Sequence, residues 1–290
     1  MHKLFKKLFY KKSAWQIGIA HSDQKALKEI VVPATVTISK RDITDIDASF
    51  VADPFLLHVD DLWYCFFEIK DREKNRGVIG ASCSKDLQNW DYLGVVLQED
   101  YHLSYPHVFT YDDAVYMIPE GGEDKSVKLY KASSFPMQWK YERTLLEGED
   151  FRDTTLLIHE GVFYFFTSLN GDDNLHLYTA DSLEDKLILH PKNPLVINNP
   201  KISRNGGTIF FYDNHIYRFA QDCSRRYGES LQWMEITKLS KTVFEQKHLG
   251  TFLQGDQATN WHSRKVHHFS AQVHLGKLFY AVDGEGWESR

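Results

Sequence analysis

Cysteine is scarce in this sequence, and the few cysteines present are not spaced as ligands or crosslinks. The 290 residues contain three, Cys65, Cys83 and Cys223, and no two of them form a CxxC pair. An odd number of widely separated cysteines argues against a disulfide framework and against a cysteine zinc site. We therefore expect a reducing compartment.

Basic charge, long apolar runs and low-complexity segments are also scarce. The formal net charge is −6, whereas a general nucleic-acid binder needs a basic face. No stretch approaches the roughly 20 apolar residues of a transmembrane helix, and the apolar run of a signal peptide does not follow the basic start. With 17 glycines and 8 prolines, no segment is typical of a long linker. We expect a cytoplasmic protein with no nucleic-acid partner.

The first twelve residues are basic and amphipathic. Met1–Lys12 interleaves five lysines with apolar residues at positions 4, 5, 8 and 9, the spacing of one helix face. One interpretation is weak, peripheral docking on the anionic inner face of a membrane; the other is a solvated tail. We treat residues 1–14 as this tail and residues 15–290 as one folded domain.

The rest of the chain contains an internal repeat. Each copy has a polar residue, an apolar run, a turn with acidic residues or glycine, an aromatic run and a second polar residue. The five copies are Asp53–Glu68, Tyr105–Glu120, Asp153–Ser168, Gly206–Gln221 and His268–Asp283. An aromatic residue stands eleven positions after the start of every copy, and no copy needs a gap.

This pattern predicts an all-β protein, a five-bladed β-propeller with four-stranded blades. The copies start 48 to 62 residues apart, and periods of about 40 to 50 residues with several strands per unit are typical of propeller blades. Each copy is a hairpin, and most are followed by two more apolar runs, such as Gly77–Ser82 and Tyr92–Leu97. The fifth copy lacks its outer strands, so we expect an N-terminal strand, Trp15–Ala20 or Ile30–Ile38, to close the ring.

The polar ends of the copies predict the position of a site. The first strand of each blade lines the axis of a propeller, so these ends gather around one funnel. We predict four catalytic carboxylates there: Asp53, Glu68, Glu120 and Asp153. One carboxyl can protonate a leaving oxygen while another acts as base or nucleophile at a glycosidic bond. Crowding raises the pKa of at least one of them.

Neighbouring positions supply candidates for substrate binding. Arginine suits a carboxylate or phosphate, and aromatic rings such as Tyr105 and Trp261 suit the face of a sugar. The predicted substrate-binding residues are Tyr105, Arg152, Arg204, Arg218, Gln221, Asp222, His267 and His268. Each of them alone is also compatible with a polar strand end that faces water.

Motifs for cofactors and for other chemistries are missing. The histidines between positions 262 and 274 lack the spacing of metal ligands on a helix. Gly206-Gly207 is too short to cradle a phosphate, and no GxSxG or Cys-His arrangement appears. We expect no cofactor and no metal in the funnel, and the sequence leaves open a structural cation on the propeller axis.

Several segments resemble carbohydrate-active propellers. The hairpin Asp53–Glu68 resembles the opening blade of glycoside hydrolase family 43. A closer resemblance, which spans nearly the whole chain, is to the N-terminal propeller domain of plant glucosamine inositolphosphorylceramide transferases and its stand-alone bacterial relatives. It is carried by SYPHVF and YMIPE within Ser104–Glu120 and by YRFAQDC and YG within Tyr217–Gly228.

The resemblance to the hydrolases implies a role for one residue and differs at others. Asp53 matches the position of their general base. Tyr105 stands where these hydrolases have an Asp, and their general acid Glu has no counterpart by motif. Glu68 and Glu120 are the candidates for the acid by position.

We predict a carbohydrate-active enzyme that transfers a glycosyl group in surface-polysaccharide or glycolipid biosynthesis. Its partners would be a sugar or nucleotide-sugar substrate and a glycan or glycolipid acceptor. Two alternatives are a glycoside hydrolase that uses the same carboxylates and a non-catalytic glycan-binding propeller.

Overall fold

The computed structural model describes residues 13–22, 27–257 and 260–287 of the chain. Within these ranges the regular structure is β-strand, apart from two short 3-10 helices at Leu27–Glu29 and Gly122–Asp124. Neither is long and apolar enough to cross a membrane. Met1–Lys12, for which we predicted membrane docking or a solvated tail, lies outside the described residues.

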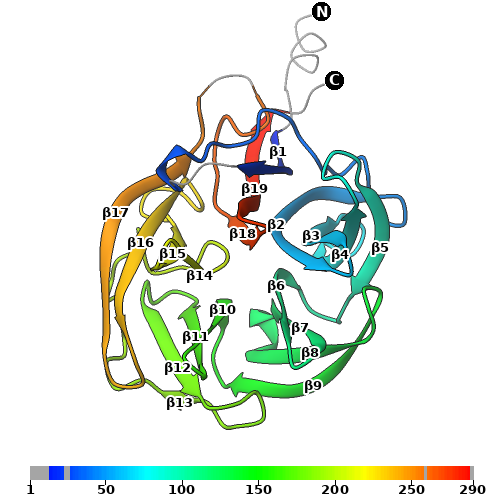
Figure 1. Ribbon diagram of the computed structural model, residues 1–290. Helices are drawn as coiled ribbons and strands as arrows, with labels where there is room; N and C mark the ends of the chain where they lie inside the picture. The colour runs from blue at the N-terminus through cyan, green and yellow to red at the C-terminus, as the bar shows by residue number, and fades with distance from the viewer. Residues whose placement is uncertain (1–12, 23–26, 258–259, 288–290) are drawn as a thin grey trace, which may run out of the picture.

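Five antiparallel sheets stand around a central axis (Figure 1). Blade 1 consists of β2 (Ala48–Val59), β3 (Leu62–Asp71), β4 (Arg76–Ser84) and β5 (Asp91–Leu97). Blade 2 consists of β6 (Ser104–Tyr111), β7 (Ala114–Glu120), β8 (Ser126–Ser134) and β9 (Gln138–Glu147). Blade 3 consists of β10 (Phe151–His159), β11 (Val162–Leu169), β12 (Leu175–Ala180) and β13 (Ile188–Leu189). Blade 4 consists of β14 (Phe210–Tyr212), β15 (His215–Gln221), β16 (Ser230–Leu239) and β17 (Phe244–Gln254).

The fifth blade combines the two ends of the chain. It contains β18 (Phe269–His274), β19 (Lys277–Trp287) and β1 (Ser13–Ser22). β1 pairs with β19 along its whole length, from Ser13 opposite Trp287 to Ser22 opposite Leu278. The predicted closure by an N-terminal strand is therefore confirmed for the segment around Trp15–Ala20. Ile30–Ile38 is not a strand: it contributes a single bridge, Ile38 to Ile17, on the outer side of β1.

The hairpin turns explain why the repeat has acidic residues at its centre. Asp60 and Asp61 both have positive φ, 48° and 60°, and Asp213 and Asn214 repeat this at 49° and 63°. Two successive left-handed residues make the tight turn whose twist matches that of the paired strands. Asp and Asn tolerate this region better than most residues.

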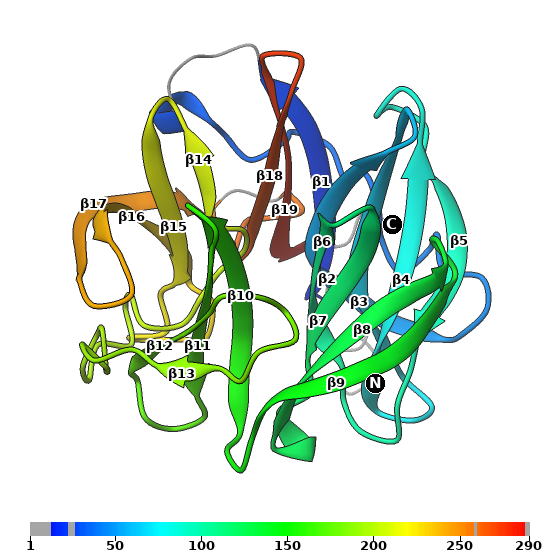
Figure 2. The same cartoon turned by 60° about the horizontal axis from the view of Figure 1, so that its bottom comes forward.

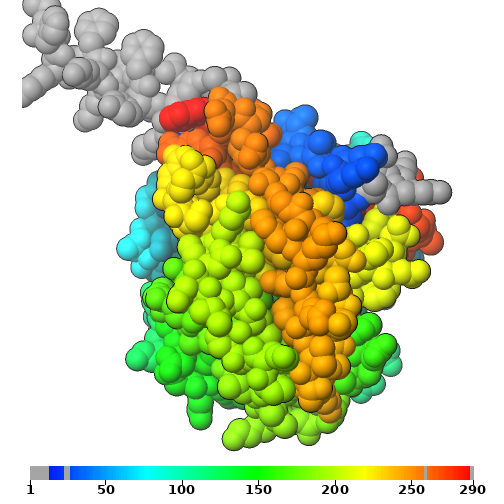
Figure 3. All heavy atoms as spheres, turned by 90° about the vertical axis from the view of Figure 1, so that its left-hand side faces the viewer, coloured from blue at the N-terminus to red at the C-terminus, as the bar shows by residue number. Residues whose placement is uncertain are grey.

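Aromatic and aliphatic side chains fill the spaces between neighbouring blades. Phe55 and Phe66 of blade 1 pack with Val108 and Met117 of blade 2 in one continuous buried cluster. Burying one such side chain stabilises the fold by about 1.5–3 kcal/mol, and a lone blade would leave these faces exposed to water. Figures 1 and 2 show the first strand of each blade on the inner side of the ring. In Figure 3 the orange β17 covers the outer side of blade 4.

The predicted all-β, five-bladed propeller is confirmed. Blades 1 to 4 have four strands, and blade 5 has three in the described part of the chain. The fourth strand of blade 3 is only two residues long, Ile188–Leu189.

Candidate active site

A bulge at the start of three inner strands builds the site. Asp53, Tyr105 and Asp153 have φ of 52°, 45° and 49°. At each of them the pairing with the next strand shifts by one residue. Bulges re-aim side chains and are common beside active sites. Here the left-handed residue turns its backbone N–H and its side chain towards neighbouring blades, so the repeat starts meet at one end of the axis.

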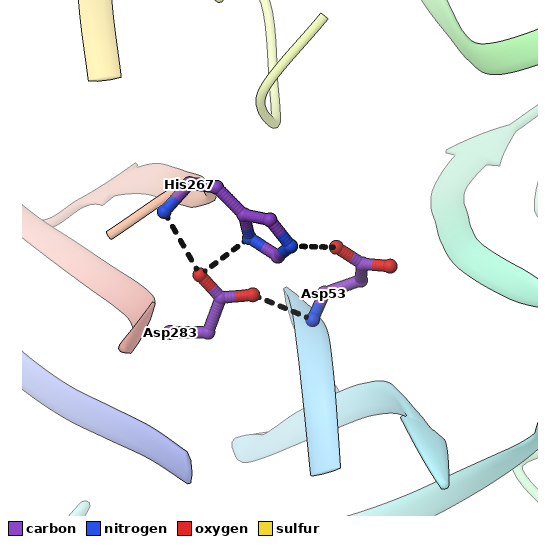
Figure 4. A group of neighbouring side chains, drawn as sticks. All are labelled: Asp53, His267 and Asp283. Carbon is purple, nitrogen blue, oxygen red and sulfur yellow. Dashed lines mark hydrogen bonds and ion pairs between the residues drawn. The ribbon is translucent and has the colours of Figure 1, made fainter. Parts of the chain in front are cut away.

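Asp53 lies in a chain of polar contacts with His267 and Asp283 (Figure 4). The backbone N–H of Asp53 donates to Oδ2 of Asp283 at 3.0 Å. His267 bonds to Oδ1 of Asp283 through its ring Nδ1, at 2.8 Å. The other ring nitrogen, Nε2, lies 4.0 Å from Oδ1 of Asp53. Asp283 thus fixes the histidine ring so that Nε2 faces the Asp53 carboxyl.

The ring of His267 is held from two further sides. Trp15 of β1 stacks on it with ring centres 4.0 Å apart, and Tyr227 meets it edge-on at 5.3 Å. Burial opposes ionisation of Asp283, but the charge and hydrogen bond of His267 lower its pKa below the ordinary value. Asp283 is therefore a carboxylate, and Nδ1 of His267 donates to it.

The Asp53 carboxyl is under-satisfied. One oxygen, Oδ2, accepts from the backbone N–H of Tyr105 at 3.3 Å, whereas Oδ1 has no hydrogen-bond partner among the described residues. Asp53 is 5% exposed. Burial, partly offset by His267, raises its pKa from 3.8 to about 6. A carboxyl with this pKa can exchange a proton near neutral pH, as a general base must.

Glu68 is a second buried acid whose pKa is raised. Burial and the negative charges of Asp53 and Glu120 raise its pKa well above the ordinary value. Its Oε1 has no hydrogen-bond partner in the described ranges, and Nε2 of His102 lies 3.3 Å from it. Glu68 therefore keeps its proton at neutral pH and has the properties of a general acid.

Two arginines hold the remaining predicted carboxylates. Arg152 donates to Glu120 at 2.6 Å, and Arg204 contacts Asp153 through Nε and Glu120 through Nη2. Burial opposes ionisation of Glu120, but Arg204 and Arg152 lower its pKa. Gln221 also donates to Asp153, at 2.9 Å. Burial, together with the charge of Glu120, raises the pKa of Asp153 well above its ordinary value, although Arg204 opposes the shift. Glu120 is thus a fixed acceptor that can bind sugar hydroxyls and does not fit the role of acid, whereas Asp153 can hold a proton.

A cation could also be held at this point. Asp53, His267 and Asp283 offer ligand atoms that lie within 4.8 Å of one another. Since Nδ1 of His267 is engaged by Asp283, Nε2 is the nitrogen left for a cation. No metal-ligand motif marks this group, because Asp53 belongs to blade 1 whereas His267 and Asp283 lie in or next to blade 5, near the other end of the chain.

Tyr105 and His268 do not occupy the substrate-binding positions predicted for them. Both are 0% exposed. The Tyr105 hydroxyl donates to the carbonyl of Gly207 at 2.9 Å and accepts from its N–H at 2.8 Å, so it crosses the axis and joins blades 2 and 4. Burial lowers the pKa of His268 to about 3, which leaves it neutral behind Asp53 and unsuited to pair with an anion.

Three other predicted contacts also lie outside the cluster. Arg218 is buried between blades and donates to Asn205 and to the carbonyl of Ile202. Asp222 accepts from the backbone and hydroxyl of Ser224 and so shapes the loop that follows β15. Trp261, expected at the mouth, is buried and donates to a backbone carbonyl on the other side of β1.

Tyr227 is the aromatic residue that the sequence analysis missed. It lies in the loop between β15 and β16, outside every repeat copy, so no periodicity marks it. It is 45% exposed, and the Arg204 guanidinium lies 5.1 Å from its ring centre. Asp283 ends the fifth copy and was therefore expected at the funnel, but it was not among the predicted catalytic or substrate-binding residues.

Two cavities flank the Tyr227 loop. The larger, about 490 Å³, is lined by Asp222, Arg225, Arg226 and Arg264, among others. The smaller, about 140 Å³, is lined by Arg152, Arg204 and Tyr227, among others, and therefore adjoins the carboxylates.

A family model and individual relatives both match this chain, and they carry the same family name. The family described as "Glucosamine inositolphosphorylceramide transferase 1, N-terminal" matches residues 11–285. Glucosamine inositolphosphorylceramide transferase 1 of Arabidopsis thaliana is 32% identical over 94% of this chain and 39% of its own length. The protein of the same name from Oryza sativa subsp. japonica is 33% identical over 82% of this chain and 33% of its length. The chain thus spans between a third and two fifths of these relatives.

Solved structures of glycoside hydrolases share the fold. An exo-beta-1,3-galactanase from Clostridium thermocellum has a TM-score of 0.59 at 17% identity, covering 82% of this chain and 56% of its own. A family 62 alpha-L-arabinofuranosidase from Coprinopsis cinerea has a TM-score of 0.58 at 12% identity, covering 80% and 90%. A family 117 glycoside hydrolase from Zobellia galactanivorans has a TM-score of 0.57 at 11% identity, covering 93% and 90%.

Proposed function

Since this chain belongs to the family of glucosamine inositolphosphorylceramide transferase N-terminal regions, we propose that it is a carbohydrate-active enzyme that transfers a glycosyl group. Asp53 is its general base and Glu68 its general acid. The observation that carries the proposal is that these two buried carboxyls each have an oxygen without a hydrogen-bond partner among the described residues.

The two carboxyls carry out different proton transfers because their environments give them different protonation states. Glu68, which retains its proton, donates it to the oxygen of the departing group as the glycosidic bond breaks. Asp53, with a pKa of about 6, accepts the proton of the attacking acceptor hydroxyl as the new bond forms. The reaction centre of such transfers is oxocarbenium-like, and the neighbouring carboxylates of Glu120 and Asp283, whose pKa values are lowered, favour its positive charge.

His267 and Asp283 act on Asp53 rather than on the sugar. His267 lowers the pKa of Asp53, against the effect of burial, and Asp283 holds the ring in place. Without the histidine, burial and the neighbouring carboxylates would keep Asp53 protonated at neutral pH, and it would not serve as a base. His267 is therefore a positioning residue for the base.

Transfer, rather than hydrolysis, is supported by the relatives, which are named as transferases. Because the chain spans only part of their length, the acceptor is part of the proposal: the hydroxyl of a glycan or glycolipid. Action on the cytoplasmic side of a membrane, and a nucleotide sugar as donor, remain predictions.

The test combines product analysis with three variants. Wild type, Asp53→Asn and Glu68→Gln are incubated with a panel of aryl glycosides and nucleotide sugars, with and without a sugar acceptor, and products are identified by mass spectrometry. Asp112→Asn, in an exposed turn with the same left-handed backbone as Asp53, is the matched control.

We expect elongated acceptor from the wild type and the control, and a loss of about 10²–10⁴-fold in Asp53→Asn, the usual contribution of a general base. Release of free sugar without elongation of any acceptor would replace transfer by hydrolysis. Equal product from wild type and Asp53→Asn would contradict the assignment of the base.

A further inference from the structure

The smaller cavity, between blades 3 and 4, has the features of a binding subsite beside the acidic side chains that Arg152 and Arg204 hold. Its lining includes Arg152, Ser168, Arg204, Cys223 and Tyr227. Its volume is about 140 Å³, a space on the scale of one sugar ring rather than of a longer glycan.

Two buried polar atoms at the cavity have no hydrogen-bond partner in the part of the chain that the structure describes. They are Oγ of Ser168, a residue that is 4% exposed, and Nε of Arg152. Buried polar groups are nearly always paired, since an unpaired group forfeits its hydration without compensation. Both atoms have almost no exposed surface, so a ligand reaches them when the side chains that cover them shift. A hydroxyl can then donate to or accept from Ser168 and can accept from Arg152, so a ligand rich in hydroxyls satisfies both.

The charge around the cavity disfavours an anion. Arg152 already pairs with Glu120 and Asp150, and Arg204 pairs with Glu120 and Asp153. The carboxylates of Glu120 and Asp150 alone match the two guanidinium groups in charge, which leaves no spare positive charge for a phosphate. Paired Arg and carboxylate groups instead present alternating donors and acceptors, the pattern that vicinal sugar hydroxyls require.

Tyr227 supplies an apolar wall. Its ring contacts Arg204 and His267 and is still 45% exposed. Gly228 keeps it there: it has φ of +62°, and a Cβ at this position would lie 2.7 Å from the His267 ring. The backbone of the loop therefore packs directly on His267, and Tyr227 is held between the base machinery and the cavity.

We propose that this cavity binds one uncharged sugar residue of the substrate, with its hydroxyls on Ser168 and Arg152 and its C–H face against Tyr227. The inference rests on the proposed function only in taking a sugar as the substrate class. The proposal places the neutral glycan part of the substrate at blades 3 and 4. It follows that a diphosphate or phosphorylated headgroup binds outside this cavity.

Cys223 provides a reporter for occupancy of the cavity. It lines the cavity and is half-buried, and Cys83, also half-buried, lies in β4 of blade 1 and serves as internal control. In the full-length Asp53→Asn protein, which does not consume ligand, the alkylation rates of both thiols are followed by peptide mass spectrometry. The probes are the methyl glycosides of glucose, galactose, mannose and N-acetylglucosamine, with glucose 1-phosphate as the anionic comparison. Saturation-transfer NMR on the same mixtures reports binding directly.

We expect at least one neutral glycoside to slow alkylation of Cys223 and not of Cys83, and to do so at lower concentration than glucose 1-phosphate. Ser168→Ala should weaken that glycoside about three- to tenfold, the effect of one lost hydrogen bond. Tyr227→Ala should weaken it at least as much, whereas Tyr141→Ala, at an exposed position on β9, should leave it unchanged.

Other results overturn the subsite. Tighter binding of glucose 1-phosphate would show that the cavity selects anions. Sugar binding that neither protects Cys223 nor responds to Tyr227→Ala would place the ligand elsewhere, even if the wild type turns over glycosides. Protection of Cys223 together with an absence of any turnover by the wild type would support the subsite while removing the proposed catalytic function.

Discussion

Replacing Asp53 by Asn should stabilise the protein at neutral and alkaline pH. In the folded protein the pKa of Asp53 is raised from 3.8 to about 6, so the folded state holds this proton more tightly than the unfolded chain. The stabilisation from the protonated form is fully present below about pH 4 and is lost as pH rises through 6. The difference between 3.8 and about 6 corresponds to about 3 kcal/mol, since each tenfold change in a protonation equilibrium is worth about 1.4 kcal/mol.

Asparagine resembles the protonated, neutral form of Asp53, so the variant isolates the contribution of this proton to stability. Its side-chain oxygen can still accept from the N–H of Tyr105, and it tolerates the left-handed backbone at φ of 52°. We expect the free energy of unfolding of Asp53→Asn, relative to wild type, to rise by about 2 kcal/mol between pH 4.5 and pH 8, with most of the rise below pH 6.5.

The assay is urea unfolding followed by tryptophan fluorescence at a series of pH values. Asp112→Asn is the control, because Asp112 is exposed and has the same left-handed backbone, with φ of 49°. Its difference from wild type should stay within about 0.5 kcal/mol. A difference for Asp53→Asn that does not change with pH, or that falls as pH rises, would refute the argument that Asp53 is held partly protonated.

Three further changes test how the site is supported, each by urea unfolding. Tyr105→Phe removes the hydroxyl that pairs with Gly207 across the axis. It should lower the free energy of unfolding by about 2 kcal/mol, because a buried N–H loses its acceptor. The control Tyr141→Phe, at an exposed position, should lower it by less than about 0.5 kcal/mol. Arg204→Met should cost about 3 kcal/mol, because two buried carboxylates lose a shared cation, and an unchanged stability would show that they are protonated. Ile17→Ala should cost about 3 kcal/mol through the cavity it leaves in the core under β1; a cost below about 1 kcal/mol would mean that β1 contributes little to ring closure.

The fold could be predicted because the repeated features of the sequence determine local structure. Acidic and glycine turns at the centre of each copy, with apolar runs on either side, specify hairpins without any tertiary information. The spacing of the copies then specifies the blades. The closing strand was predictable as a class only: periodicity cannot tell which N-terminal segment pairs with β19, because that choice depends on contacts between the two ends of the chain.

The site was predictable in position but not in detail. Copy ends such as Asp53 and Glu68 could be assigned to one mouth because equivalent positions in a propeller converge. Asp53 and Tyr105 occupy the same repeat position and have the same bulge, so the local backbone does not distinguish them. The long Tyr105 side chain reaches Gly207 of blade 4 and becomes a buried link between blades, a contact that only the folded structure shows. Tyr227 belongs to a loop with no counterpart in other copies, so its place beside His267 follows only from the folded structure.

The pH dependence of kcat/KM tests the central assignment most directly. It is measured from pH 4.5 to 8 on whichever glycoside the wild type turns over best, and it reports the pKa of the essential base in the free enzyme. With Asp53 as base, activity should rise through a limb near pH 6, the pKa expected for this carboxyl, and Asp53→Asn should lose both the limb and the activity. A flat profile in the wild type, or the same limb in Asp53→Asn, would contradict the assignment.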